Sequence, residues 1–310
     1  MPVEVFLITV VPAADTTKAR SVLHGYTETR PVTHRFTRVR HVRRLDQSIR
    51  GIPILRSLQS SNPKPDSLAQ WQDLHSTLSR QQYMLTERVD ITQDAEAAVA
   101  AGQPVPMSEQ TQKGERILRF NDFPDPPNPR VPQTVMQRKQ IDIREPGPLL
   151  EQHMADSGFS VANEYIEETY HWWDNNNLEF VLWRQYNDLP NPTPAPLVQA
   201  PDQANWMVPD MSKMEPVAPF WMLYVRALVD ANPVDRMAER MAEAHGRLGK
   251  VEKELEGVFS FMVFDRRALD TRYTGEDPDL LAVKNSTRRE VPRRLWPQVS
   301  VVCVSLGVQS

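Results

Sequence analysis

The stretch Phe159–Tyr186, FSVANEYIEETYHWWDNNNLEFVLWRQY, decides the fold that this sequence predicts. Two runs rich in aromatic and β-branched residues, Phe159–Trp173 and Leu178–Tyr186, flank the polar sequence DNNN at 174–177. Such runs on either side of an Asp/Asn turn are typical of two antiparallel strands joined by a short hairpin. We therefore expect an antiparallel sheet to be the centre of the fold.

Seven further segments have the composition of strands, and they are Val3–Val11, Pro31–Arg44, Gln82–Ile91, Glu115–Phe120, Thr134–Arg144, Phe220–Val229 and Val258–Asp265. We expect Val3–Val11 to be buried on both faces except near Glu4, and Pro31–Arg44 to be exposed. Eight or nine strands joined by hairpins and long loops favour a closed antiparallel structure over a doubly wound α/β fold. The predicted fold class is mainly β (α+β): an antiparallel β-barrel of about eight strands with flanking helices and long proline-rich loops.

Three segments are predicted to be helices, and they are Asp15–Thr29, Gly147–Ser157 and Asn232–Leu255. The last has Asn232 as N-cap, Pro233 in the first turn, and an apolar stripe that includes Met237 and Met241. We expect this stripe to pack on the barrel, with docking to a partner helix as the alternative.

The connections between these elements are predicted to be long. Leu45–Arg80 is expected to be an inserted loop that holds a short helix near Ser67–Leu78. Thr92–Pro106 is expected to be a loop with at most one helical turn. Proline makes up 27 of the 310 residues and glycine only 11. Thirteen of the prolines fall in two intervals, Pro124–Pro132 and Pro190–Pro219, and both intervals lie between predicted strands. The proline excess therefore predicts two extended loops on a folded scaffold.

We expect one β-barrel domain at 1–272, with the inserted loop 45–80 and the proline-rich loop 190–219. Residues 273–310 form a divergent C-terminal tail, predicted to be disordered or a gene-model artefact. The single cysteine, Cys303, lies in this tail and cannot form an intramolecular disulfide, which fits a reducing compartment. The sequence has neither the pattern of a signal peptide nor an apolar run long enough to span a membrane.

Glu164 and Glu168 alternate with Ile166, which places both carboxylates on one face of a strand. Two such carboxylates suit metal binding or acid/base chemistry, but a polar outer face with Tyr165 packed inside is the favoured interpretation. Glu167 falls on the other face. No nucleotide-binding glycine motif, nucleophile motif or zinc motif is present, so no catalytic, cofactor-binding or metal-binding residue is predicted.

A basic run from His34 to Arg50 covers most of the second predicted strand and continues past its end, and its arginines are Arg35, Arg38, Arg40, Arg43, Arg44 and Arg50. It suits nucleic acid or an acidic partner, but the net charge of −4 favours a solvated edge strand instead. No direct nucleic-acid contact is expected.

A set of aromatic residues is predicted to form the barrel core, with a stacking platform or ligand pocket as the alternative. They are Tyr170, Trp172, Trp173, Phe180, Trp183, Phe220, Trp221 and Tyr224.

Several segments together resemble subunit 18 of the Mediator complex in its fungal form. They are VFLITVVPAADTTKARSVLHGYT near the start, RILRFNDFPDPP at Arg116–Pro127, EYIEETYHWW with LEFVLWRQY, PFWMLYVRALVDA, and FSFMVFDRRALDTR at Phe259–Arg272. The order and spacing agree along roughly Val3–Arg272. The resemblance implies an antiparallel barrel that pairs with a related barrel, subunit 20, and engages a C-terminal helix of subunit 8. It implies a nuclear, non-catalytic structural subunit of the Mediator head module, a coactivator of RNA polymerase II.

The barrel is also similar to that of triphosphate-tunnel enzymes, which gives a metal-dependent phosphohydrolase as the alternative function. Those enzymes need a Glu-x-Glu pair inside the barrel. The first strand here has Glu4 followed by Phe6 and Ile8 on the same face, and the Glu164/Glu168 pair has wider spacing. The sequence therefore departs from the pattern of the enzyme.

Overall fold

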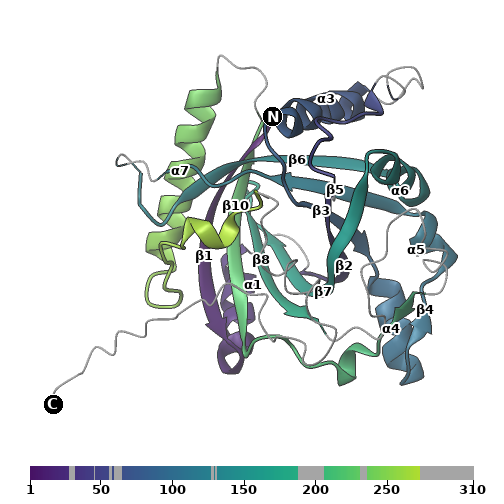
Figure 1. Ribbon diagram of the computed structural model, residues 1–310. Coiled ribbons are helices and arrows are strands. Elements are labelled where there is room, and N and C mark those ends of the chain that lie inside the picture. Colours follow the sequence, from purple (N-terminus) through teal and green to yellow (C-terminus); the bar gives the residue numbers. More distant parts are fainter. Residues whose placement is uncertain are drawn as a thin grey trace, which may run out of the picture. The chain divides into compact units, whose positions relative to one another are not determined.

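The computed structural model describes residues 1–27, 32–44, 46–55, 58, 65–126, 129, 131–187, 206–230 and 236–272. Its main feature is a closed barrel of antiparallel strands in the order β1-β10-β8-β7-β2-β3-β5-β6, with β6 paired back onto β1 (Figure 1). The barrel strands are β1 (Val3–Pro12), β2 (Thr33–Arg44), β3 (Leu85–Asp90), β5 (Glu115–Asn121), β6 (Met136–Pro146), β7 (Phe159–Trp173), β8 (Glu179–Tyr186) and β10 (Phe220–Val229). This confirms the predicted fold class.

Helices flank the barrel within the described residues. They are α1 (Thr16–Thr27), α3 (Pro65–Arg80), α4 (Thr92–Ala101), α5 (Glu109–Lys113), α6 (Gly147–Asp156) and α7 (Met237–Glu254). A small second sheet pairs β4 (Val105–Pro106) with β9 (Met207–Val208), and three 3-10 turns are η1 (Ala13–Asp15), η4 (Met211–Lys213) and η6 (Arg266–Leu269). None of these helices has the length and hydropathy that a membrane span requires.

The predicted hairpin forms as β7 and β8, paired from Ile166 opposite Tyr186 to Trp173 opposite Glu179. Its turn is held by Asp174, whose Oδ1 accepts the backbone N–H groups of Asn176 and Leu178 at 2.8 and 2.7 Å. An Asp side chain that satisfies backbone donors in this way mimics a turn of the main chain. The aspartate of the DNNN sequence therefore fixes the register of the two strands.

Most of the hydrophobic core lies outside the barrel wall, and a smaller cluster of Phe6, Ile8 and Met136 lies on the inner face. Helices α1 and α7 cover β1, β10 and β8 through residues such as Leu23, Leu248, Val5 and Phe180. A second apolar layer lies under α3 and α6, and a third lies under α4 and the β4–β9 sheet. Figure 1 shows α7 along β1 and β10, and α3 and α6 beside β5 and β6. The aromatic and aliphatic side chains that point outward from the strands are thus buried by helices.

Two predicted elements are wrong. The segment Thr92–Pro106 contains the ten-residue helix α4, because its alanines favour helix and Gly102 ends it in a left-handed conformation (φ 63°). The segment Val258–Asp265 is not a strand. Its Met262 N–H donates to the Ile8 carbonyl at 3.2 Å, and Thr9 Oγ1 donates to the Ser260 carbonyl at 2.6 Å. No ladder forms there, because Met262 to Ile8 is the one main-chain hydrogen bond between this segment and β1 among the described residues.

Two expectations about the connections are met. The short helix near Ser67–Leu78 lies within α3, and the proline-rich intervals lie between β5 and β6 and between β8 and β10. Much of Pro190–Pro219 lies outside the described residues, as do Asn232, Pro233, Cys303 and the whole tail from residue 273. Predictions made on those residues stay predictions.

Candidate functional site

The barrel interior is lined by the residues that alternate with the outer apolar layer. On β1, Val3, Val5 and Leu7 pack under the helices, so Glu4 and Phe6 point inward. The register places Glu4 opposite Arg138 on β6 and Phe6 opposite Arg226 on β10. The same alternation on the other strands gives the interior a high content of charged side chains.

Glu4 is the most deeply buried of these charges, with an exposed fraction of 0%. Its Oε2 lies 2.7 Å from Arg138 Nε, and its Oε1 lies 3.0 Å from Arg226 Nη1. The Tyr224 hydroxyl donates to the same carboxylate at 3.1 Å. Burial opposes ionisation of Glu4, but the two guanidiniums outweigh it and lower its pKa. The expectation that β1 is exposed near Glu4 is therefore wrong, because two buried cations compensate this carboxylate.

A second carboxylate, Glu179 on β8, continues this network from the other side of Arg226. Arg226 Nε lies 2.5 Å from Glu179 Oε2, and His171 Nδ1 lies 2.7 Å from Glu179 Oε1. Burial raises the pKa of Glu179, but the His171 hydrogen bond and Arg226 lower it overall to about 2. Burial likewise opposes the charge on Arg226, yet Glu179 and Glu4 raise its pKa.

Two more ion pairs complete the middle of the interior. Arg119 donates from Nε and Nη2 to Asp142 at 2.8 and 2.7 Å. Arg88 donates to Glu167. With the Glu4 network, these pairs place four guanidiniums against four carboxylates in the barrel interior. The guanidiniums belong to Arg88, Arg119, Arg138 and Arg226, and the carboxylates belong to Glu4, Asp142, Glu167 and Glu179.

This arrangement is chemically a neutralised ionic core. Each of the four carboxylates is held by a guanidinium, so metal binding or proton transfer requires breaking an ion pair first. Among the described residues, no three His, Cys, Asp or Glu side chains come together as metal ligands do. The geometry suits a structural role for the interior.

Glu164 and Glu168 lie on one face of β7, as predicted, and that face is the outer one. Glu164 forms a two-point pair with Arg38 at 2.7 and 3.0 Å. Glu168 accepts from Arg184 Nε and the Tyr186 hydroxyl, both at 2.7 Å. Burial raises the pKa of Glu168, but the contacts with His34, Tyr186 and Arg184 lower it overall to about 2. The opposite face carries Tyr165 and Glu167 inward. The favoured interpretation, a polar outer face, is correct, although the cations make it a paired one.

The structure contradicts both interpretations of the basic strand, which is β2. Because β2 pairs with β3 and β7 in a closed barrel, it is no edge strand. Arg38, Arg40 and Arg44 are 4%, 3% and 1% exposed. Arg40 pairs with Glu87 at 2.5 Å and with Glu151 at 3.2 Å. These three arginines therefore lie buried at the outer side of the barrel wall and form no exposed basic surface.

Arg44 differs from the other two because backbone carbonyls hold it. Its guanidinium donates to the carbonyls of Ser157, Ile49 and Gly51 and lies over the Phe159 ring, 4.4 Å from the centroid. Burial lowers its pKa to about 10, so it stays charged at neutral pH. Arg44 therefore connects the 49–51 loop to the end of α6.

The predicted aromatic set is buried in part, and its location differs from the prediction. Trp172, Phe180 and Trp221 pack between the barrel wall and the helices α1 and α7, with exposed fractions of at most 4%. Tyr224 points inward, where it stacks on Phe6 with ring centroids 4.8 Å apart. Part of the aromatic set thus forms the layer under the helices, while paired charges and a few rings fill the interior.

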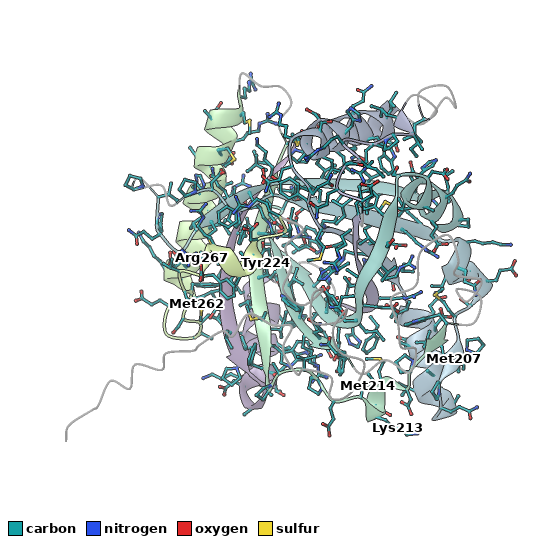
Figure 2. The ribbon with its side chains drawn as sticks, in the orientation of Figure 1. Met207, Lys213, Met214, Tyr224, Met262 and Arg267 are labelled. Atoms are coloured by element: carbon teal, nitrogen blue, oxygen red, sulfur yellow. The ribbon has the colours of Figure 1, made fainter. Side chains whose placement is uncertain are left out.

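Helix α7 packs on the barrel, as predicted. Ala244, Leu248 and Val251 are buried against the wall, and Met237 and Met241 are partly buried at the same layer. The Tyr26 hydroxyl of α1 donates to Glu254 at 2.6 Å, which ties the two helices together. Figure 2 shows Met262 and Arg267 on this side of the molecule, far from Met207 and Lys213 beside the β4–β9 sheet.

Sequence reasoning missed the interior ion network. One signal was present: Glu4 lies inside an apolar strand, and an acid buried in such a strand must be paired. Its partners Arg138 and Arg226 come from β6 and β10, and only the strand order identifies them.

One protein-family model matches the sequence over the whole barrel. The family model described as Med18 protein matches residues 3–272, from the first residue of β1 to the end of the described chain. The chain belongs to the Med18 family. This confirms the resemblance to subunit 18 of the Mediator complex. None of the curated proteins matches the chain.

Among the solved structures that are similar to this Med18 family member, three illustrate the range. The Mediator head module of Schizosaccharomyces pombe contains a chain with 15% identity and a TM-score of 0.49, over 84% of this chain and 97% of that one. A putative adenylyl cyclase from Hippeastrum, reported to have a dominant triphosphatase activity, has 7% identity and a TM-score of 0.39, over 86% and 94%. The PH1819 protein of Pyrococcus horikoshii has 11% identity and a TM-score of 0.38, over 86% and 97%. Likenesses at this level carry no information about activity.

Proposed function

We propose that this protein is a non-catalytic structural subunit of the Mediator head module, acting in regulated transcription by RNA polymerase II through protein–protein contacts. The observation that carries the proposal is the family match, which spans the whole barrel and its flanking helices. Such a subunit acts in the nucleus. Its partners are subunit 20, as a related barrel, and the C-terminal helix of subunit 8.

The barrel interior supports a structural role. Its central carboxylates and guanidiniums neutralise each other, and Glu4 and Glu179 share Arg226. A polyphosphate needs cations that are free to meet it, and a catalytic metal needs free carboxylates. Ion pairs hold both kinds of group here, which favours the coactivator subunit over the triphosphate-tunnel phosphohydrolase.

Reconstitution tests the proposal. The full chain is co-expressed with subunits 20 and 8 of the same organism, and the purified complex is analysed by size-exclusion chromatography with light scattering. We expect a stable complex that contains the three chains. Elution of this chain alone at micromolar concentration contradicts the proposal.

An activity assay tests the alternative function, a metal-dependent phosphohydrolase. The purified chain is incubated with ATP or tripolyphosphate and Mg²⁺ or Mn²⁺, and released phosphate is measured. We expect no release above the protein-free blank. Metal-dependent release that follows the chain through purification supports the phosphohydrolase instead.

A further inference from the structure

The segment that follows α7 crosses one end of the barrel. We call residues 259–272 the strap, and it includes η6. Near the start of the strap, Met262 N–H donates to the Ile8 carbonyl of β1 at 3.2 Å. Near its end, the Thr271 carbonyl accepts the N–H of Met84, just before β3, at 2.8 Å. Strands β6 and β5 lie between β1 and β3 in the barrel, so the strap joins two strands that are not neighbours.

Two apolar side chains of the strap cover the inner face of the barrel at this end. Phe264 and Leu269 pack against a cluster of Phe6, Ile8 and Met136, which are at most 7% exposed. Phe6 and Met136 are the last pair of the seam between β1 and β6. The strap therefore lies over the place where the pairing of these two strands ends.

Single polar contacts hold the rest of the strap. Arg266 donates from Nε to the Pro124 carbonyl at 2.8 Å, and its guanidinium lies over the Phe123 ring, 4.4 Å from the centroid. Thr271 Oγ1 donates to the carbonyl of Asn121, the last residue of β5, at 2.7 Å. The strap is thus attached point by point along its length.

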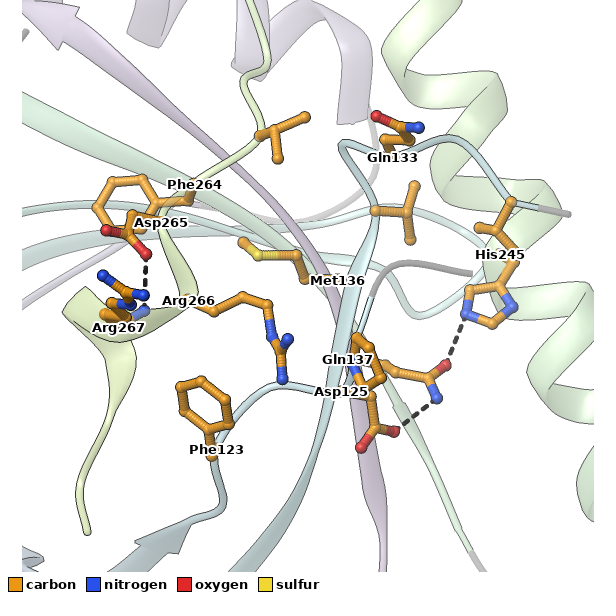
Figure 3. A pocket seen from close by; sticks show the side chains of 14 residues that line it. Phe123, Asp125, Gln133, Met136, Gln137, His245, Phe264, Asp265, Arg266 and Arg267 are labelled. Carbon is orange, nitrogen blue, oxygen red and sulfur yellow. Dashed lines mark hydrogen bonds between the residues drawn. The ribbon is translucent and has the colours of Figure 1, made fainter. Parts of the chain in front are cut away.

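This attachment is weaker than that of a barrel strand. Among the described residues, two main-chain hydrogen bonds join the strap to β1 and to the start of β3, whereas β1 and β10 pair along ten residues. A hollow of about 280 Å³ beside the strap, lined in part by Met136 and Phe264, leaves the packing there incomplete (Figure 3). Segments with few main-chain bonds and incomplete packing open at a lower free energy than the strands around them.

We propose that the strap is a lid that opens as one unit while the barrel strands stay paired. When closed, it keeps water from the end of the interior where Tyr224 stacks on Phe6 and donates to Glu4. When open, it lets water reach this end, and water weakens buried ion pairs. Opening of the strap is a property of the chain by itself and does not depend on the proposed function.

Hydrogen exchange of single amides, measured by NMR on the full chain at several denaturant concentrations, tests the lid. The reporters are the amides of Met262 and Met84, which bond across the closed strap at its two ends. The reference is the amide of Leu223 in β10, a strand that is paired on both sides. We expect both reporters to exchange through one common opening, with a weak dependence on denaturant and at least tenfold faster than Leu223.

Two variants separate opening of the strap from unfolding of the whole chain. Phe264→Ala removes a contact between the two anchors, and it should speed exchange of Met262 and Met84 by the same factor, about tenfold or more. Its matched control is Val263→Ala, at a neighbour that is 57% exposed, which should change both by less than about twofold. Ile166→Val, in the apolar layer under α4, should speed exchange of Leu223 severalfold and leave both reporters unchanged.

Two results overturn the proposal. If Phe264→Ala speeds exchange of Met262 and leaves Met84 unchanged, the strap is not one unit. If Ile166→Val speeds all three amides equally, the strap opens only when the chain unfolds. Leu269→Val is a smaller deletion with the same expected pattern, and it replaces Phe264→Ala if that variant does not fold.

Thiol labelling tests whether opening uncovers the interior. Met136→Cys is made together with Cys303→Ser, which removes the single cysteine of the sequence. The thiol at position 136 should react with a soluble maleimide through the same opening that exposes the amides of Met262 and Met84. Labelling that proceeds only as fast as the chain unfolds, measured by exchange of Leu223 in the same variant, contradicts a lid over the interior.

Discussion

Arg138 Nε lies 2.7 Å from Glu4 Oε2, and this ion pair crosses the seam at which β6 closes the barrel onto β1. The seam is short. It pairs Val3–Phe6 with Met136–Lys139, whereas β1 and β10 are paired along all of Val3–Pro12. A buried pair at a short junction of a barrel contributes to closure, and the loss of one partner costs stability.

Replacing Glu4 should therefore destabilise the fold strongly. Glu4→Gln leaves Arg138 and Arg226 without their shared carboxylate, and we expect a loss of about 3–5 kcal/mol in the free energy of unfolding. Chemical denaturation measures it. The control is Glu115→Gln, which breaks an exposed pair with Arg144 and should leave the denaturation midpoint unchanged. Equal midpoints for the two variants would show that the Glu4 network is not structural.

The interior and outer carboxylates predict a specific dependence of stability on pH. Glu179 and Glu168 have folded-state pKa values of about 2, below the unfolded value of about 4.3. A depressed folded pKa stabilises the fold above the unfolded pKa, and this stability is lost as the pH falls from about 4 toward 2. Each group contributes roughly 3 kcal/mol at neutral pH. The free energy of unfolding should fall steeply as the pH is lowered from about 6 to 2, and it should fall less steeply in the Glu179→Gln variant. An unchanged slope in that variant contradicts the assignment.

Arg44 should be sensitive to replacement by lysine. An ammonium group cannot reproduce the planar fork that reaches the carbonyls of Ser157, Ile49 and Gly51, so Arg44→Lys should cost about 2–4 kcal/mol of stability. The exposed Arg50 is the matched control, and Arg50→Lys should be neutral. Thermal unfolding of the two variants compares them, and similar midpoints would mean that the carbonyl contacts contribute little.

Two glycines predict effects of opposite sign. Gly51 has φ +62°, and a Cβ there would lie 2.6 Å from the His75 ring, so Gly51→Ala should destabilise by about 1–3 kcal/mol. Gly25 lies in the last turn of α1 with open space around it, so Gly25→Ala should stabilise by up to about 0.5–1 kcal/mol. Differential scanning calorimetry gives both values. If both substitutions change the stability in the same direction, the explanation given for Gly25 or for Gly51 is wrong.

The sequence predicted the elements whose signal is local. The β7–β8 hairpin follows from aromatic runs around Asp174, and the apolar stripe of α7 follows from helical spacing at Ala244, Leu248 and Val251. Helix α4 was missed because its alanines give almost no apolar periodicity, although their intrinsic helix propensity is high.

The contacts of the candidate site join residues that lie far apart in the sequence. Arg38 and Arg40 look like an exposed basic strand until the barrel closes and brings Glu164 and Glu87 against them. Glu4 likewise meets Arg226 only because β10 lies beside β1. Charge pairing across strands is set by topology and register, which composition does not reveal.

The central claim, that this Med18 family member works as a Mediator subunit, is tested most directly by affinity purification of the tagged full chain from nuclear extract followed by quantitative mass spectrometry. The account predicts that Mediator head subunits are recovered in near-stoichiometric amounts with the chain and are absent from an untagged control. Recovery of the chain without any Mediator subunit would contradict the account.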